Sequence, residues 1–172
     1  MKIIKVHKIS DVLTTVLLEG EGSWISAHKP KAKFKANGTE YSADLKATAA
    51  EVEAFNSELG TSKKLKTSKK DPKDTSINFK ASGEYQDGTP TSPIPVFDIN
   101  RQPMTEDIGN GSLVRLQINI VPYEFAGTVG LSARLTVVQV LNLVPYVKAG
   151  LDLDLFDAED NPNTTNTIPR LF

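Results

Sequence analysis

The chain has 172 residues, 39% of them hydrophobic, and its 20 basic and 21 acidic side chains give a net charge of −1. This length is enough for one domain with a single core, and the lack of cysteine excludes a disulfide framework and thiolate chemistry. No run approaches the roughly 18 apolar residues that a membrane helix requires, so we expect a soluble intracellular protein without a membrane span.

Charge is unevenly distributed along the chain. Residues 61–80 contain seven lysines and two aspartates, a local net charge of +5, whereas residues 151–160 contain five acids and no base. A basic body with an acidic tail indicates a polyanion as partner for the body, and a basic partner, or the body itself, for the tail. We therefore predict a domain at residues 1–148 and an acidic, disordered tail at residues 149–172.

Hydrophobic periodicity and turn residues predict mostly strands. In chain order, we expect strands at residues 12–18, 23–28, 41–45, 77–85, 96–100, 113–123 and 131–143. One short helix is expected at about residues 49–59, because Thr48 and Glu51 have capping-box spacing and Gly60 supplies a stop. Residues 61–74, which follow it, are expected to form a mobile basic loop. This order of elements predicts a mainly β fold, compatible with an OB-fold, a five-stranded Greek-key barrel.

The strand at residues 113–123 leads into two aromatic residues on its polar face. Its even positions are apolar and its odd positions are mostly polar, and the same parity places Tyr123 and Phe125 with the polar side chains. Exposed aromatic rings beside cations are typical of proteins that stack the bases of single-stranded nucleic acid. The alternative is that Pro122 twists the strand and turns both rings into the core. Stacking is favoured for Tyr123, whereas Phe125 fits either environment.

Trp24 is the only tryptophan, and it shares a predicted strand face with Ser26 and His28. An indole on a polar face fits a stacking platform, and it equally fits a tryptophan that is mostly buried at the rim of a barrel.

Several cations are candidates for phosphate contacts. Lysines at every second position would project from one side of an extended strand: Lys29, Lys31, Lys33 and Lys35. Such a row binds phosphate or is a solvated face, and the nearby Trp24 favours phosphate. Arg115 and Arg134 fall on the polar faces of later strands, where each can contact DNA or form a surface ion pair.

The chain offers little for catalysis or for metal binding. It has two histidines, no cysteine, no nucleophile elbow and no phosphate-cradling Gly-Lys-Ser loop. The acids after residue 151 lack the glycine and the final glutamate of an EF-hand loop. We expect a protein that is not an enzyme and that has no cofactor or metal.

Residues 109–143 resemble the final barrel strands of the single-stranded DNA-binding proteins of short-tailed bacteriophages, especially the T-odd coliphage type. The resemblance lies in the Gly-Ser start, the Val-Pro-Tyr-x-aromatic end of the strand and the Val-Gly-x-Ser turn. A looser likeness extends over about residues 23–143, including His28-Lys29-Pro30. The resemblance implies a viral OB-fold protein that coats single-stranded DNA in phage DNA replication, recombination and repair, in the cytoplasm of the infected bacterial host.

The family's acidic C-terminal tail, which ends in an aromatic residue, implies contacts with replication proteins such as a polymerase or a helicase/primase. The corresponding residues here are Asp152, Asp154, Asp157, Glu159, Asp160 and Phe172. The chain departs from the pattern because residues 161–172 contain no acid and include Arg170. A tail that shields the basic groove is the hypothesis we favour, and a homodimer is a further candidate assembly. Two other classes remain open: a phage structural or decoration β-barrel without DNA affinity, and an OB-type adaptor that binds protein.

Overall fold

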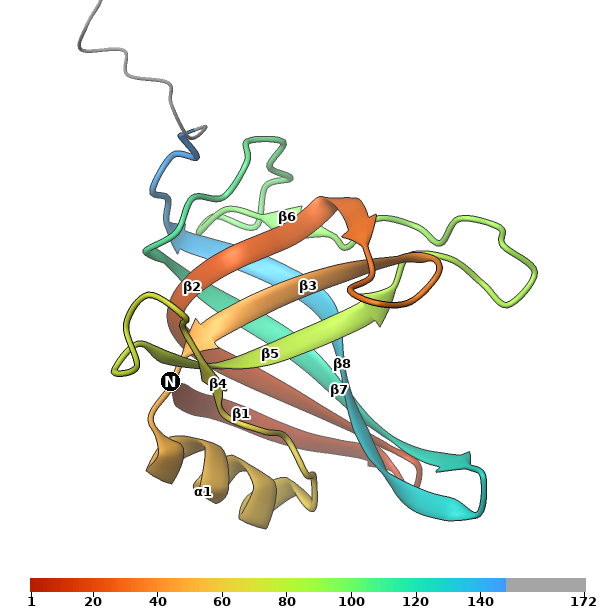
Figure 1. The fold of residues 1–172 in the computed structure, drawn as a ribbon. Helices are drawn as coiled ribbons and strands as arrows, with labels where there is room; N and C mark the ends of the chain where they lie inside the picture. Colours follow the sequence, from red (N-terminus) through yellow and green to blue (C-terminus); the bar gives the residue numbers. More distant parts are fainter. Residues whose placement is uncertain (148–172) are drawn as a thin grey trace, which may run out of the picture.

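Five strands pair around a closed ring in the computed structural model, which describes residues 1–147 (Figure 1). Around the ring they are β2 (Leu13–Ala32), β3 (Thr39–Lys46), β5 (Thr75–Ser82), β8 (Thr128–Asn142) and β7 (Ser112–Phe125). β7 pairs again with β2, and every pairing is antiparallel except the parallel bridge of β5 to β8 at Lys80 and Arg134. This mixed five-stranded barrel has the order of an OB-fold, so the predicted fold class is confirmed.

Three further strands extend this barrel at its edges. β1 (Lys2–Ser10) pairs with β2, β4 (Lys66–Thr67) pairs with β5, and β6 (Val96–Phe97) runs parallel to β8. The N-terminal segment was expected to be a strand, but β1 was not separated from the strand at residues 12–18, because most of its side chains are exposed and leave little burial pattern in the sequence.

The strands expected at residues 12–18 and 23–28 are one strand, β2, of 20 residues. Its first half pairs with β1 and β7 and its second half with β3, so the strand bends as it changes partners near Gly22. The glycines at positions 20 and 22 suggest an interruption, but backbone pairing continues through them.

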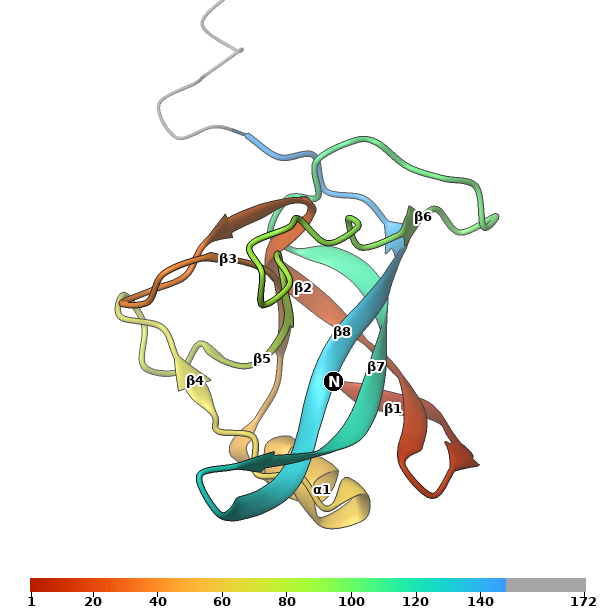
Figure 2. The same cartoon turned by 90° about the vertical axis from the view of Figure 1, so that its right-hand side faces the viewer.

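The predicted helix is confirmed as α1 (Ala49–Leu59), which lies under one end of the barrel (Figure 2). The hydroxyl of Thr48 accepts the backbone N–H of Glu51 at 3.2 Å, and the Glu51 carboxylate accepts the N–H of Thr48 at 2.9 Å. Gly60 ends the helix with φ 70°. α1 buries Phe55, whose ring meets Phe79 of β5 edge-on at 5.6 Å, and so closes this end of the core.

Buried and more exposed side chains alternate along β7, as predicted. Its even positions are buried in the barrel: Val114, Leu116, Ile118 and Ile120. The odd positions from 115 to 121 are half-buried, and the last four residues of β7, 122–125, are exposed.

The segment at residues 61–74 is not the free loop that was expected. The side chain of Asn56 bonds to both the N–H and the carbonyl of Lys63, and Lys66 lies 2.6 Å from the buried carboxylate of Asp44. A buried carboxylate needs a partner, and the segment is anchored because it supplies one.

Within residues 1–147, no helix is long and apolar enough to span a membrane. The predicted tail residues Asp152, Asp154, Asp157, Glu159, Asp160 and Phe172 lie outside the described residues, and the boundary after residue 148 stays a prediction.

Candidate nucleic-acid interface

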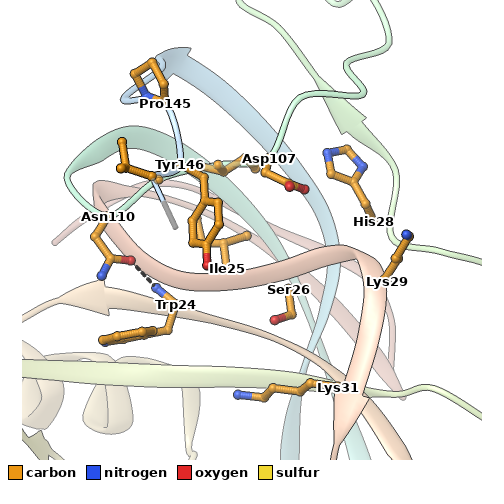
Figure 3. A pocket seen from close by; sticks show the side chains of 13 residues that line it. Trp24, Ile25, Ser26, His28, Lys29, Lys31, Asp107, Asn110, Pro145 and Tyr146 are labelled. Carbon is orange, nitrogen blue, oxygen red and sulfur yellow. Dashed lines mark hydrogen bonds between the residues drawn. The ribbon is translucent and has the colours of Figure 1, made fainter. Parts of the chain in front are cut away.

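A pocket of about 780 Å³ lies on the outer face of β2, at the end of the barrel opposite α1 (Figure 3). β2 supplies residues 24–26, 28, 29 and 31 to its wall, and two later segments supply residues 107–110 and 145–147. The volume falls within the range of about 300 to 1,000 Å³ that is usual for ligand sites. Two aromatic side chains, two lysines, a histidine and a carboxylate share this one hollow.

Trp24 is turned outward by its own backbone. It has φ 50°, and the β2–β3 register shifts between Ser23 and Ser26, so the alternation expected for this strand is interrupted. The N–H of Trp24 donates to the side-chain oxygen of Asn110 at 2.8 Å. The indole is 67% exposed, which excludes the mostly buried alternative and leaves a flat apolar surface facing solvent.

Tyr146 is the second aromatic residue of the pocket, and it was not among the site residues predicted from the sequence. The bridge between Ile108 and Pro145 places it there, and Gly109 is needed because a Cβ at this position would lie 2.5 Å from two carbonyl oxygens. Its ring is 59% exposed. A signal was present in the sequence, since Val-Pro-Tyr occurs twice, at residues 121–123 and again at 144–146.

The four lysines do not form one row. Lys29 and Lys31 remain in β2 and line the pocket, but the strand ends at Ala32. Lys33 starts a loop that its N–H closes on the carbonyl of Gly38, and Lys35 has φ 55°. The alternation predicted from an extended chain is therefore wrong for Lys33 and Lys35, because the turn between β2 and β3 begins before them.

The pocket rim carries hydrogen-bond acceptors in addition to the two lysines. Nε2 of His28 lies 2.8 Å from the carbonyl oxygen of Glu106. A carbonyl oxygen only accepts, so Nε2 carries a proton, and a neutral imidazole would keep Nδ1 as an acceptor. Asp107 adds an exposed carboxylate between Tyr146 and His28 in Figure 3.

Tyr123 and Phe125 lie elsewhere, at the tip of the β7–β8 hairpin. Phe125 faces Thr128 across a two-residue turn in which Ala126 and Gly127 have φ 49° and 80°. Such a turn suits a hairpin because its twist matches that of the strands. β7 is 14 residues long, so this tip and the pocket are separated by roughly 40 Å along the strand. The structure does not bring Trp24 and this aromatic pair into one cluster.

The two rings also differ in exposure. Tyr123 was expected to be the more exposed of the two, but the structure shows the opposite. Phe125 is 79% exposed and Tyr123 is 42% exposed. The Tyr123 side chain covers its register partner Gly130, where a Cβ would come within 2.9 Å of two ring carbons and the hydroxyl oxygen. Phe125 is therefore not a core residue, and Tyr123 has a packing role of its own.

The two arginines have different surroundings. Nε of Arg115 lies 2.9 Å from Oε1 of Glu19, its register partner on β2, so Arg115 is a cross-strand ion-pair residue. Arg134 is exposed, forms no ion pair with any residue in the described part of the chain, and lies beside Lys80 at the β5–β8 seam. Arg134 is the freer cation of the two.

Further cations cover the outer face of β3. Three of its polar side chains are buried: Glu40, Ser42 and Asp44. Lys80 pairs with Glu40 at 3.1 Å, and Lys66 pairs with Asp44. Burial lowers the pKa of the nearby Lys63, and the positive charge of Lys80 lowers it further, against the opposing attraction of Asp44. Ion pairing therefore fixes Lys66, from the segment that was expected to be a mobile loop, and Lys80 on the barrel.

The barrel has the fold of known single-stranded DNA-binding proteins of bacteriophages. It superposes on gp2.5, a single-stranded DNA-binding protein encoded by bacteriophage T7, with a TM-score of 0.50 and 16% identity over 80% of this chain and 97% of that one. It superposes on the single-stranded DNA-binding protein of bacteriophage Enc34 with a TM-score of 0.51 and 15% identity, over 90% of this chain and 98% of that one. The Enc34 protein in complex with single-stranded DNA gives a TM-score of 0.52 and 13% identity, over 81% and 96% of the two chains.

No family profile matches the sequence, and neither does any curated protein. The likeness is thus one of fold, and it covers nearly the whole length of each phage protein.

Proposed function

We propose that this protein binds single-stranded DNA. The observation that carries the proposal is the pocket, in which the exposed rings of Trp24 and Tyr146 share a surface with Lys29 and Lys31. Flat apolar rings stack on unpaired bases of any sequence, and ammonium groups bind the phosphates between them. The shared fold supports the same conclusion, because the phage proteins with this barrel are named for that activity.

Stacking in the pocket favours a single strand over a duplex. In a duplex the bases are stacked on one another, and their faces are not free to contact an indole or a phenol ring. Aromatic stacking contributes about 1 to 3 kcal/mol for each base, which is large relative to one screened phosphate contact. The exposed Trp24 and Tyr146 therefore fit the unpaired form.

The hairpin tip is a second contact surface in this proposal. Phe125 and Tyr123 stack further bases there, and Arg134 adds a positive charge at the β5–β8 bridge. Lys33 and Lys35 add positive charge beside the pocket from their loop. Arg115 contributes least, since Glu19 neutralises it.

The cellular role follows from the same likeness. We propose a viral protein of phage DNA replication, recombination and repair that acts in the host cytoplasm and binds without catalysing a reaction. Its acidic tail would shield the DNA-binding groove and contact replication proteins. We also propose that the protein assembles as a homodimer. Deletion of residues 151–172 tests the tail: DNA affinity at low salt should rise, and an unchanged affinity would count against shielding.

The test of binding is a titration with oligo-dT, followed by Trp24 fluorescence and by anisotropy of a labelled strand. Because Trp24 is the sole tryptophan, its quenching reports on the pocket itself. Affinity should fall with salt, with a slope of about −0.7 per neutralised phosphate. Trp24→Ala should weaken binding, whereas Ile99→Ala removes an exposed apolar side chain that lies neither in the pocket nor at the hairpin tip and controls for general loss of surface.

The alternative is a phage structural or decoration barrel, whose lysines only solubilise it. It predicts no oligo-dT affinity at low salt and stable incorporation into virions. Failure of both fluorescence and anisotropy to respond to oligo-dT would favour it over DNA binding.

A further inference from the structure

Asp107 is an unexpected residue in a pocket for a polyanion. Its exposed carboxylate lines the hollow together with Trp24 and Tyr146, and it forms no ion pair within residues 1–147. A carboxylate repels phosphate, so at this place it weakens the contact that Lys29 and Lys31 provide. It becomes favourable only if the group that faces it is a hydrogen-bond donor.

The donors of single-stranded DNA are on the edges of its bases. Guanine presents N1–H and N2–H₂ side by side, so one carboxylate can accept two parallel bonds from it, as it does from an arginine. Thymine presents a single N3–H between two carbonyl oxygens, which the carboxylate repels. Adenine and cytosine each present one amino group next to a ring nitrogen that only accepts.

His28 reinforces this selection if its ring is neutral. Its Nε2–H is used by the carbonyl of Glu106 at 2.8 Å, and Nδ1 then remains as an acceptor on the same rim. Two acceptors beside two aromatic rings form a surface that stacks a base and bonds to donors on its edge.

We propose that this pocket is a guanine-selective subsite, in which Asp107 accepts N1–H and N2–H₂ of a guanine that packs against the exposed rings of Trp24 and Tyr146. The proposal rests on the proposed DNA binding and deepens it. The rest of the interface remains tolerant of sequence, because phosphate contacts and stacking at the hairpin tip carry no information about the base. The protein would then bind any single strand and bind guanine-containing strands more tightly.

The experiment compares three oligonucleotides of about 12 nucleotides. They are oligo-dT, an alternating dT/dG strand and an alternating dT/dI strand, and each competes with a labelled oligo-dT for the full-length protein. Inosine lacks only the 2-amino group of guanine, so the third strand isolates that donor. We expect dT/dG to bind about tenfold more tightly than oligo-dT, as for one bidentate base contact, with dT/dI between them.

Asp107→Asn should reduce this preference to less than about twofold and should raise the affinity for oligo-dT, because a negative charge is removed. Glu106→Gln is the matched control: it makes the same charge change at the adjacent residue, whose side chain does not line the pocket, and it should keep the preference.

Equal binding of the three strands would overturn the base selectivity and leave DNA binding intact. A preference that survives Asp107→Asn would also overturn it. Failure of the protein to bind any of the strands would overturn the proposed function and the subsite together.

Discussion

The backbone N–H of Trp24 donates a 2.8 Å hydrogen bond to Oδ1 of Asn110, which lies two residues before the start of β7. Trp24 has φ 50°, a left-handed conformation that is uncommon for a bulky residue and persists only when its surroundings support it. The bond to Asn110 supplies part of that support. One amide therefore holds the bend of β2 and turns the indole toward solvent.

Replacing Asn110 with Ala should release this bend. The free energy of unfolding should fall by about 1 kcal/mol, as for one hydrogen bond, and the affinity for oligo-dT should fall because Trp24 is no longer fixed. Urea unfolding and oligo-dT titration measure the two effects. Asn110→Asp keeps the acceptor oxygen and should retain most of the stability. An alanine variant with unchanged stability and affinity would refute the role of this bond.

Phe125→Ala should weaken binding to oligo-dT by about tenfold without a loss of stability. The ring is 79% exposed and contributes little to the core, whereas stacking on a base contributes about 1 to 3 kcal/mol. Combined with Trp24→Ala, its effect should add, because sites roughly 40 Å apart along β7 do not share contacts. The measurement is anisotropy for both single variants and the double variant, and an unaltered affinity in Phe125→Ala would remove the hairpin tip from the interface.

Thr48→Ala should lower the free energy of unfolding by about 1 kcal/mol and leave DNA affinity unchanged. The hydroxyl of Thr48 caps α1, and α1 lies at the end of the barrel opposite the pocket. Thr48→Ser keeps the capping oxygen and should behave as the wild type. Chemical unfolding and oligo-dT titration check both parts, and weaker DNA binding by Thr48→Ala would show that the two ends are coupled.

Lys63 should make stability rise with pH in the alkaline range. Burial lowers its pKa from the ordinary value of 10.5, and Lys80 lowers it further, so between the lowered pKa and 10.5 the unfolded chain holds more protons at this site. The free energy of unfolding then increases with pH across that window. Above 10.5 Lys63 is deprotonated in both states, so it causes no further increase.

Lys63→Met should accordingly be more stable than the wild type at about pH 7, by a margin that shrinks toward about pH 10. Urea unfolding at both values measures this margin. Lys64→Met removes the exposed neighbouring lysine and is the matched control. If the stability difference between Lys63→Met and the wild type does not change with pH, the pKa of Lys63 is not lowered in the folded protein.

Elements whose signals are local could be predicted from the amino-acid sequence alone. The capping box at Thr48 and Glu51 and the stop at Gly60 specify α1 to the residue, and the period-two pattern of β7 specifies which side chains enter the barrel. Both depend on neighbours within a few positions, as backbone capping and strand alternation do. The exposed face of β7 and the mainly β barrel could be predicted for the same reason.

Which distant residues share a site depends instead on contacts between segments that are far apart in the chain. Tyr146 and Asp107 reach Trp24 through the bridge of Ile108 to Pro145, and Lys33 and Lys35 leave the strand where β2 turns into β3. Tyr123 is partly covered because its register partner is Gly130, while Phe125 beside the turn has no such cover. Register, bends and chain crossings are set by packing of the whole barrel, and a single strand read alone does not contain them.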